Sequence, residues 1–311
     1  MKKISLVVPV YNEEENIVEL YNEITKALND FELIMVDDGS DDKSWEIIKE
    51  ISKKDKRVKG IRFTRNFGQT PAIKAGINNS TGDIIVTLDA DLQNDPLDIP
   101  KLLSEMDRGY DLVSGWRKDR KDAFFLRVLP SKIANWLISK ITSVSLHDYG
   151  CTLKAYKREI IENIDLYGEM HRFIPALCGY AGAKISEIKV NHRPRLRGKS
   201  KYGIVRIFKV ILDLMTVKFM GNFITKPIYF FGIFSFVLLS VSSIFFLITL
   251  YNKWYNHIFV KDQPLFLVAI FLSLAGLELG LIGLVAEMLT RIYYSGSKKD
   301  YFIKEKTYEE K

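Results

Sequence analysis

Short apolar runs alternate with amphipathic segments along the first third of the chain. Strands are predicted where these runs are rich in Val, Ile and Leu, at 4–11, 31–38, 58–64 and 83–89. Helices are predicted where apolar residues recur on one face, at 15–28, 44–54 and about 70–79. Asp95 before Pro96 predicts a further helix start, with Asp as the N-cap. This alternation predicts an α/β fold whose mostly parallel sheet is covered by helices on both faces.

Two much longer apolar runs follow in the last third of the chain. The first, 227–250, carries no charge, and the second, 264–289, is charged only at Glu278 and Glu287. A helix needs about 20 apolar residues to cross the ~30 Å hydrocarbon core of a bilayer. Both runs are therefore predicted to be transmembrane helices; the alternative for each is a helix buried in a soluble core.

The stretch at 203–225 is mostly apolar and carries Arg206, Lys209 and Asp213 on one helical face. Its place just before a span predicts an amphipathic helix in the membrane interface, and the alternative is a soluble core helix. The predicted organisation is an α/β domain at 1–202, this interfacial segment, two spans within 226–290 and a tail at 291–311.

Charge and the N-terminal sequence predict the topology. The apolar stretch at 4–10 is too short for a signal peptide, so the first domain is expected in the cytosol. The tail carries more Lys and Arg than the loop between the spans, which predicts that both termini lie on the cytosolic side of the inner membrane. The net charge of +7 fits an anionic membrane surface better than a nucleic acid, because basic residues cluster near the spans.

Cys151 and Cys178 lack metal-ligand or disulfide spacing and are predicted to be packed thiols.

Acidic residues stand at the carboxyl ends of the predicted strands, where open α/β sheets bind ligands. Asp89 and Asp91 follow a buried strand, so their burial and mutual repulsion call for a compensating cation. Carboxylate oxygens suit Mg²⁺ or Mn²⁺, which keep coordination positions open for phosphate oxygens. At the preceding strand end, Asp38 is expected to contact a nucleobase or ribose, whereas Ser40 to Asp42 are expected to cap the following helix.

Four stretches together carry a family resemblance. They are VVPVYNEEENI, IMVDDGSDD, TGDIIVTLDADLQNDP and RLRGKSKYG. They resemble the family 2 glycosyltransferases of GT-A fold, and more narrowly the polyprenyl-phosphate glycosyltransferases, over essentially the whole chain including the two spans. The resemblance implies a nucleotide-sugar donor, a polyprenyl-phosphate lipid acceptor and a divalent metal, Mg²⁺ or Mn²⁺.

The resemblance also implies roles for individual residues. The nucleotide-sugar site would comprise Pro9, Tyr11, Glu13, Asp37, Asp38, Ala90 and Arg117. The metal would be held by Asp89, Asp91 and Gln93. Asp148, Arg193 and Arg197 would be catalytic, and Arg193, Arg197, Ser200 and Lys201 would bind the acceptor phosphate. Two departures stand out, since the stretch around Asp148 is shorter than the family's version and the tail lacks the Arg-Pro-x-Tyr that often follows the last span.

The acceptor's chemistry refines these roles. A phosphate monoester has a second pKa of about 6, so at neutral pH it is mostly a dianion and already nucleophilic. We therefore expect Asp148 mainly to position groups, while the basic loop around Arg197 screens the repulsion between acceptor and donor phosphates. Gly198 and Gly203 are expected to let that loop close over the donor.

Three further residues have two interpretations each. Glu169 and His171 stand either at the start of a core helix or at the floor of the acceptor site. Glu278, a charge within a span, either contacts a partner helix or is neutralised without a catalytic part.

The sequence thus predicts an inverting sugar transfer to undecaprenyl phosphate at the cytosolic membrane face, for modification of cell-envelope glycans. Uridine is the base expected from the bacterial members of the family, the sugar stays open, and two spans per chain favour a homo-oligomer among membrane lipids. One alternative is a processive polysaccharide synthase, which would need a Gln-x-x-Arg-Trp motif and more spans than this chain has. The other is a membrane protein that binds nucleotide without catalysis.

Overall fold

The computed structural model describes residues 2–118, 129–142, 144–166, 168–194, 216, 219 and 226–296. The chain separates into two compact units, Met1–Val217 and Lys218–Lys311. The predicted interfacial helix at 203–225 lies outside the described residues, apart from residues 216 and 219. The predicted tail also lies outside them after residue 296.

The first unit is built on a mixed sheet, and its described residues form seven strands in the order β3-β2-β1-β4-β6-β5-β7. The strands are β1 (Ile4–Val10), β2 (Glu32–Asp37), β3 (Val58–Arg62), β4 (Ile84–Thr87), β5 (Leu112–Trp116), β6 (Lys154–Lys157) and β7 (Ile185–Lys189). Neighbours are parallel except for β6, which runs antiparallel to both β4 and β5. The predicted mostly parallel α/β sheet is confirmed, with β6 as the exception.

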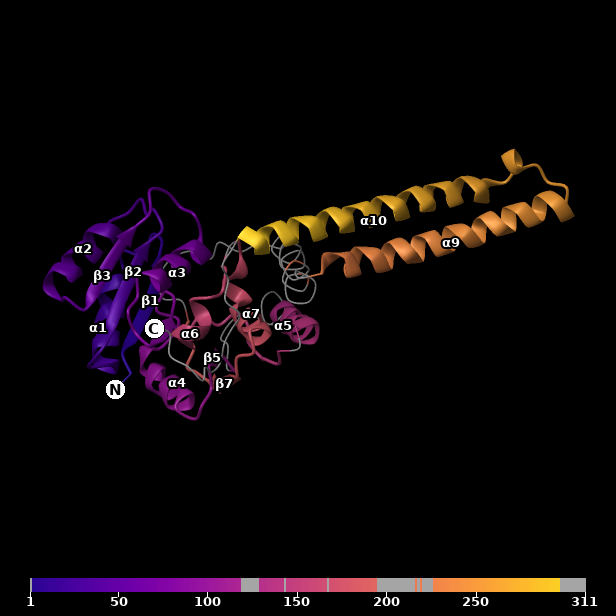
Figure 1. The fold of residues 1–311 in the computed structure, drawn as a ribbon. Helices are drawn as coiled ribbons and strands as arrows, with labels where there is room; N and C mark the ends of the chain where they lie inside the picture. The colour runs from indigo at the N-terminus through magenta and orange to yellow at the C-terminus, as the bar shows by residue number, and fades with distance from the viewer. Residues whose placement is uncertain are drawn as a thin grey trace, which may run out of the picture. The chain divides into compact units, whose positions relative to one another are not determined.

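Helices cover both faces of the sheet, because the strands are apolar on both faces. The first-unit helices are α1 (Ile17–Ala27), α2 (Ser44–Lys54), α3 (Gln69–Asn78), η1 (Pro96–Asp98), α4 (Ile99–Met106), α5 (Leu129–Thr142), α6 (Arg158–Ile161), η3 (Met170–Arg172) and α7 (Ile174–Tyr180). Leu6 and Val8 of β1 belong to the core with α1, α2 and α4. Val7 faces α3, which comes so close at Gly76 that a Cβ there would clash with the valine. Figure 1 shows α1, α2 and α3 around the first three strands.

The second unit is an antiparallel helical hairpin of α9 (Pro227–Tyr255) and α10 (Pro264–Gly296), joined through η4 (Val260–Asp262) (Figure 1). Small residues let the helices approach: Ser235 Oγ donates to the Gly276 carbonyl at 2.6 Å, and Ser242 Oγ to the Ala269 carbonyl at 2.7 Å. Both helices are long and apolar enough to cross a membrane, and most of their apolar surface stays exposed within the hairpin. Both helices thus match the predicted transmembrane spans in length and composition, and each extends past the predicted span by one to two turns.

Candidate active site

The carboxyl ends of β1, β2 and β4 meet at one edge of the sheet, because these three strands are adjacent and parallel. Their following loops carry most of the residues predicted to bind a ligand. Pro9 lies inside β1, where it pairs with Val36, while Tyr11 and Glu13 lie in the loop that follows. The Glu13 carboxylate accepts a hydrogen bond from Asn16 Nδ2 at 2.6 Å.

The loops after β1 and β2 are joined by hydrogen bonds from backbone amides to side-chain oxygens. The amides of Asn12, Glu13 and Glu14 donate to Ser40 Oγ, Ser44 Oγ and Asp42 Oδ2 at 3.0, 3.0 and 3.1 Å. Asp42 also accepts from the amide of Ser44 at the start of α2, at 2.9 Å. Of the residues predicted to cap the helix, Asp42 accepts from its first amide, whereas the Ser40 side chain and the Asp41 amide bond to the loop after β1.

Asp37 and Asp38 are both buried, yet they have different partners. Asp37 forms an ion pair with Arg62 Nε at 3.1 Å and accepts from the Ser40 amide at 3.1 Å. Asp38 accepts from the amides of Phe67 and Gly68 at 2.7 and 2.9 Å, which ties the loop after β3 to the end of β2. Burial is the largest influence on Asp38 and raises the pKa of its carboxyl, against the effect of these two amides.

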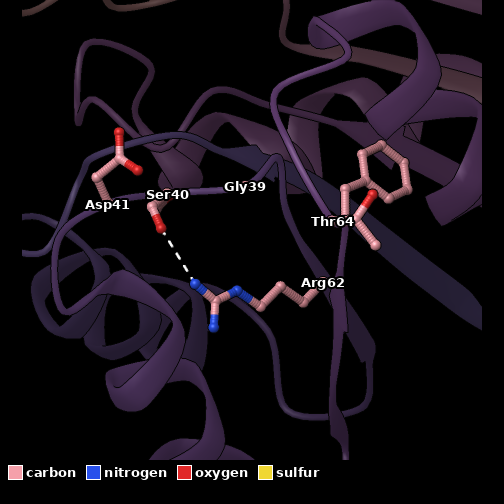
Figure 2. A pocket seen from close by; sticks show the side chains of 6 residues that line it. Gly39, Ser40, Asp41, Arg62 and Thr64 are labelled. Atoms are coloured by element: carbon pink, nitrogen blue, oxygen red, sulfur yellow. Dashed lines mark hydrogen bonds between the residues drawn. The ribbon is translucent and has the colours of Figure 1, made fainter.

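A hollow of about 450 Å³ opens where β2 and β3 end, lined by Gly39, Ser40, Asp41, Arg62, Phe63 and Thr64. Figure 2 shows Arg62 reaching toward Ser40, whose carbonyl accepts from Nη2 at 3.1 Å. Gly39 has φ +68°, and a Cβ there would clash with the backbone of Arg65, so only glycine fits this turn. The hollow lies next to Asp37 and Asp38, at the edge of the sheet where the parallel strands have their carboxyl ends.

The metal motif begins two residues after β4. Asp89 is partly buried, Ala90 and Asp91 are buried, and Leu92 adopts φ +59°, which turns the chain sharply. Gln69 Nε2, at the start of α3, donates to Asp89 Oδ1 at 2.7 Å. Burial, and next the neighbouring Asp91 carboxylate, raise the pKa of Asp89 to about 7.

A divalent cation fits this pair on the evidence of its charge. Among the described residues no cluster of three or more His, Cys, Asp or Glu side chains forms a metal-binding set. Burial and the neighbouring Asp91 raise the pKa of Asp89, whose carboxylate accepts from the neutral amide of Gln69, so a divalent cation between the two carboxylates would relieve their repulsion. Mg²⁺ and Mn²⁺ are commonly held by one or two carboxylates together with substrate phosphates.

Arg117 and Asp148, predicted for separate roles, form a two-pronged ion pair in the structure. Arg117 Nε lies 2.7 Å from Asp148 Oδ2, and Nη2 lies 3.0 Å from Oδ1. Gly150 N also donates to Asp148 Oδ1, at 3.1 Å. Burial alone would lower the pKa of Arg117, but the Asp148 carboxylate outweighs it and raises the pKa well above its usual range.

The environment of Asp148 includes residues that the sequence prediction missed. Glu187 on β7 accepts from the amides of Asp148 and His147 at 2.9 and 3.0 Å. Lys154 on β6 is buried and donates to the carbonyls of Cys151 and Tyr149. Burial lowers the pKa of Lys154. Lys154 could not be predicted from the sequence, because no residue around it indicates that its strand runs antiparallel to its neighbours.

Two more residues that the sequence did not predict for the site are Gln69 and Thr70. A third, His171, has two predicted roles. His171 is buried, and its Nδ1 lies 2.8 Å from Thr70 Oγ1. Thr70 follows Gln69, the residue that holds Asp89, so one helix start connects both. Because α3 follows a strand that ends at the same sheet edge, its first residues could have been included by the rule that found Asp38 and Asp89.

The segment 191–194 leads toward the predicted basic loop and lies along the metal motif. Asn94 and His192 form a β-bridge, and the Arg193 amide donates to the Gln93 carbonyl at 2.9 Å. The Arg193 guanidinium is occupied by ion pairs with Glu23 at 2.6 Å and Asp95 at 2.9 Å. This arrangement gives Arg193 a structural task and does not favour the predicted contact with the acceptor phosphate. Arg197, Ser200 and Lys201 lie outside the described residues.

The buried Cys151 and Cys178 are free thiols, as predicted. Burial raises the pKa of Cys151 to about 11, so this thiol stays protonated. Neither cysteine therefore adds a nucleophile to the site.

Solved structures identify the fold. Two crystal structures of glucosyl-3-phosphoglycerate synthase from Mycobacterium tuberculosis, both with Mn²⁺ and uridine diphosphate, align with TM-scores of 0.55 and 0.56. The alignments cover 71% of this chain and 78% and 80% of those chains, at 17% and 18% identity. Together with the sheet order, these likenesses define the GT-A fold.

The sequence comparisons then give the family. The profile described as Glycosyl transferase family 2 matches residues 5–165. Dodecaprenyl-phosphate galacturonate synthase of Rhizobium johnstonii is 42% identical over 312 residues, covering 97% of this chain and 91% of that protein. The chain belongs to glycosyl transferase family 2, and the protein is a glycosyltransferase.

Proposed function

We propose that this enzyme transfers a sugar from a nucleoside-diphosphate sugar to a polyprenyl phosphate at the membrane. The observation that carries the proposal is the pair of carboxylates at the end of a buried strand, where burial and the neighbouring Asp91 raise the pKa of Asp89. The relative of 42% identity, a dodecaprenyl-phosphate galacturonate synthase, supports the acceptor class. The two helices able to cross a membrane support an acceptor that is itself a membrane lipid.

The donor would lie along the carboxyl edge of the sheet. The hollow beside Gly39 and Arg62 falls within the usual ~300–1,000 Å³ of small-ligand pockets and would take the nucleobase. Asp89 and Asp91, with Gln93 beside them, would hold Mg²⁺ or Mn²⁺, which when bound would neutralise charge on the diphosphate leaving group. Gln69 would fix the orientation of Asp89 through its 2.7 Å hydrogen bond.

The acceptor phosphate would be the nucleophile, so the protein's task is to align it rather than to remove a proton. Both oxygens of Asp148 already accept hydrogen bonds, from Arg117 and Gly150, which supports a positioning role for Asp148. Sugar transfer would then be one in-line displacement with inversion at the anomeric carbon. The basic residues Arg197 and Lys201 stay the predicted contacts of the acceptor phosphate, from the sequence alone.

The test is sugar transfer to a short-chain polyprenyl phosphate by the full chain in detergent, with the lipid product detected by mass. UDP-galacturonate is the first donor to try, followed by other UDP-sugars, so that the assay also selects the sugar. EDTA should abolish product and added Mn²⁺ or Mg²⁺ should restore it. Asp89→Ala and Asp91→Ala should each lower the rate by at least about 100-fold.

The matched control is Asp107→Ala, which removes an exposed carboxylate at the end of α4, far along the chain from the strand-end loops. Full activity after chelation, or in the Asp89→Ala/Asp91→Ala double variant, would refute the proposal. A ladder of products would instead identify a processive synthase, and tight UDP binding without any lipid product would identify a non-catalytic binder.

A further inference from the structure

Helix α10 has two different faces on opposite sides of its axis. One face consists of small residues and packs against α9: Ala269, Ser273, Gly276, Gly280 and Gly283. The opposite face is apolar and exposed, and it carries Leu267, Phe271, Leu274, Leu281, Val285 and Met288, each more than half exposed. Glu278 belongs to this second face, and its side chain is exposed as well. We call these seven residues, 267 to 288, the outer stripe.

The outer stripe has the spacing of a helix-pairing seam. Its members follow one another at alternating intervals of four and three residues, which is the a/d pattern of a heptad repeat. A seam of this kind packs against a second helix at a small crossing angle, and the same geometry is common between transmembrane helices. Within the described part of the second unit, α9 contacts the other face of α10, so the stripe is not used inside the hairpin.

Glu278 is the one polar member of the stripe and lies at the middle of the 29-residue span Pro264–Ile292. No hydrogen bond or ion pair joins its carboxyl to any described residue. A carboxyl group facing hydrocarbon at this depth is costly, and such groups normally face a protein partner. The second face of α10 therefore needs an occupant that offers a polar group at the bilayer midplane.

A second copy of the same chain meets this requirement by symmetry. Copies inserted with the same topology place α10 parallel and in register, so each Glu278 meets its counterpart at the same depth. A protonated carboxyl both donates and accepts a hydrogen bond, which makes it complementary to itself. A single polar residue in a heptad seam is also the feature that fixes register in helix pairs.

We propose that α10 pairs with α10 of a second copy along the outer stripe, with the two Glu278 carboxyls hydrogen-bonded to each other at the bilayer midplane. The pairing is independent of the sugar-transfer chemistry, because the stripe belongs to the second unit and the site to the first. Of the two interpretations that the sequence allows for Glu278, the proposal selects contact with a partner helix.

The test uses the purified full chain in liposomes of synthetic phosphatidylcholine and phosphatidylglycerol, so that no other protein is present. Leu274→Cys and Leu281→Cys, on the stripe, should form disulfide-linked dimers under mild oxidation. The matched controls Leu272→Cys and Leu279→Cys are partly exposed leucines of the same helix, each two residues before its stripe counterpart and so about 160° away around the axis, and they should cross-link much less. The native cysteines are buried in the first unit and serve as an internal background.

Energy transfer between donor- and acceptor-labelled copies, measured over a lipid dilution series, gives the strength of pairing. Glu278→Leu should weaken it about 3- to 30-fold, the range of interhelical hydrogen bonds in membranes, while Glu278→Gln should keep most of it. Equal cross-linking at stripe and control positions would overturn the proposal. So would a monomer at all dilutions, which would mean that a different membrane protein covers the stripe.

Discussion

Replacing Asp148 separates two roles that this carboxylate could have, a proton acceptor in the reaction and the partner of a buried cation. The structure favours the second, because the side chains of Asp148 and Arg117 are only 3% and 13% exposed and join at 2.7 and 3.0 Å. Asp148→Ala leaves the Arg117 guanidinium buried without its counter-charge. Breaking such a pair from one side costs about 3–5 kcal/mol, a large part of the ~5–15 kcal/mol that stabilises a domain.

This cost predicts a measurable loss of thermal stability. For a domain of the size of the first unit, each kcal/mol lowers the melting temperature by about 2–4 °C, so Asp148→Ala should melt about 6–20 °C lower. Arg117→Ala should cost a similar amount. Because the two residues share one interaction, the double variant should be more stable than the sum of the single losses predicts, by about 1–3 kcal/mol.

The assay is thermal unfolding of the purified full chain in detergent, followed by sugar transfer at a temperature where every variant is folded. Asp148→Asn is the conservative variant, since it keeps an oxygen acceptor for Arg117 and loses the charge. If Asp148 positions Arg117, Asn should retain measurable transfer together with an intermediate melting temperature. An Asp148→Asn variant that melts like the original protein and has no transfer would refute this reasoning and make Asp148 a group of the reaction itself.

Three further outcomes are expected. Gln69→Leu should weaken Mn²⁺ binding in the presence of UDP by about 5- to 30-fold in calorimetry, because Asp89 loses the donor that orients it; unchanged metal affinity would remove Gln69 from the site. Hydrogen bonds to Glu32 outweigh its burial and lower its pKa from 4.5 to about 2. Glu32 therefore stabilises the fold above about pH 4.5 by at most ~3 kcal/mol, and this is lost as the pH falls toward 2; urea unfolding of Glu32→Gln at pH 7 and pH 3 should show a deficit at pH 7 that is less than half as large at pH 3. Gly76→Ala should destabilise the first unit by about 1–3 kcal/mol in the same urea assay, since the new methyl group meets Val7, and a neutral result would mean that α3 can shift away.

The elements of the first half of the sheet could be predicted because their signals are local. Helix α2 begins and ends at the predicted residues, Ser44 and Lys54, and the four predicted strands each contain an observed one. The apolar periodicity that buries a helix or a strand is written in neighbouring residues, and the parallel arrangement follows from the helical crossovers. The position of the carboxylates at one edge followed from the same rule.

Contacts between distant residues could not be predicted in this way. Arg117 and Asp148 come from different loops around β5 and β6, and their pairing depends on β6 running antiparallel between β4 and β5. Nothing in the four residues of β6, Lys154–Lys157, sets the direction of the strand. The family resemblance predicts that Arg193 binds a phosphate, and it does not predict that the fold brings Glu23 and Asp95 to this guanidinium. Charge type alone indicates what a side chain can bind, and tertiary structure decides which partner it meets.

The distribution of partners around the sheet edge explains where a cation belongs. Asp37 has Arg62, and Asp148 has Arg117, so each of these carboxylates is neutralised by a guanidinium of the same chain. Asp89 differs, because its carboxylate accepts from the neutral amide of Gln69, while burial and the neighbouring Asp91 raise its pKa. Keeping a negative charge on Asp89 at this partly buried position costs stability. Such a cost is maintained where a ligand supplies the missing charge, and here that ligand would arrive together with the donor diphosphate.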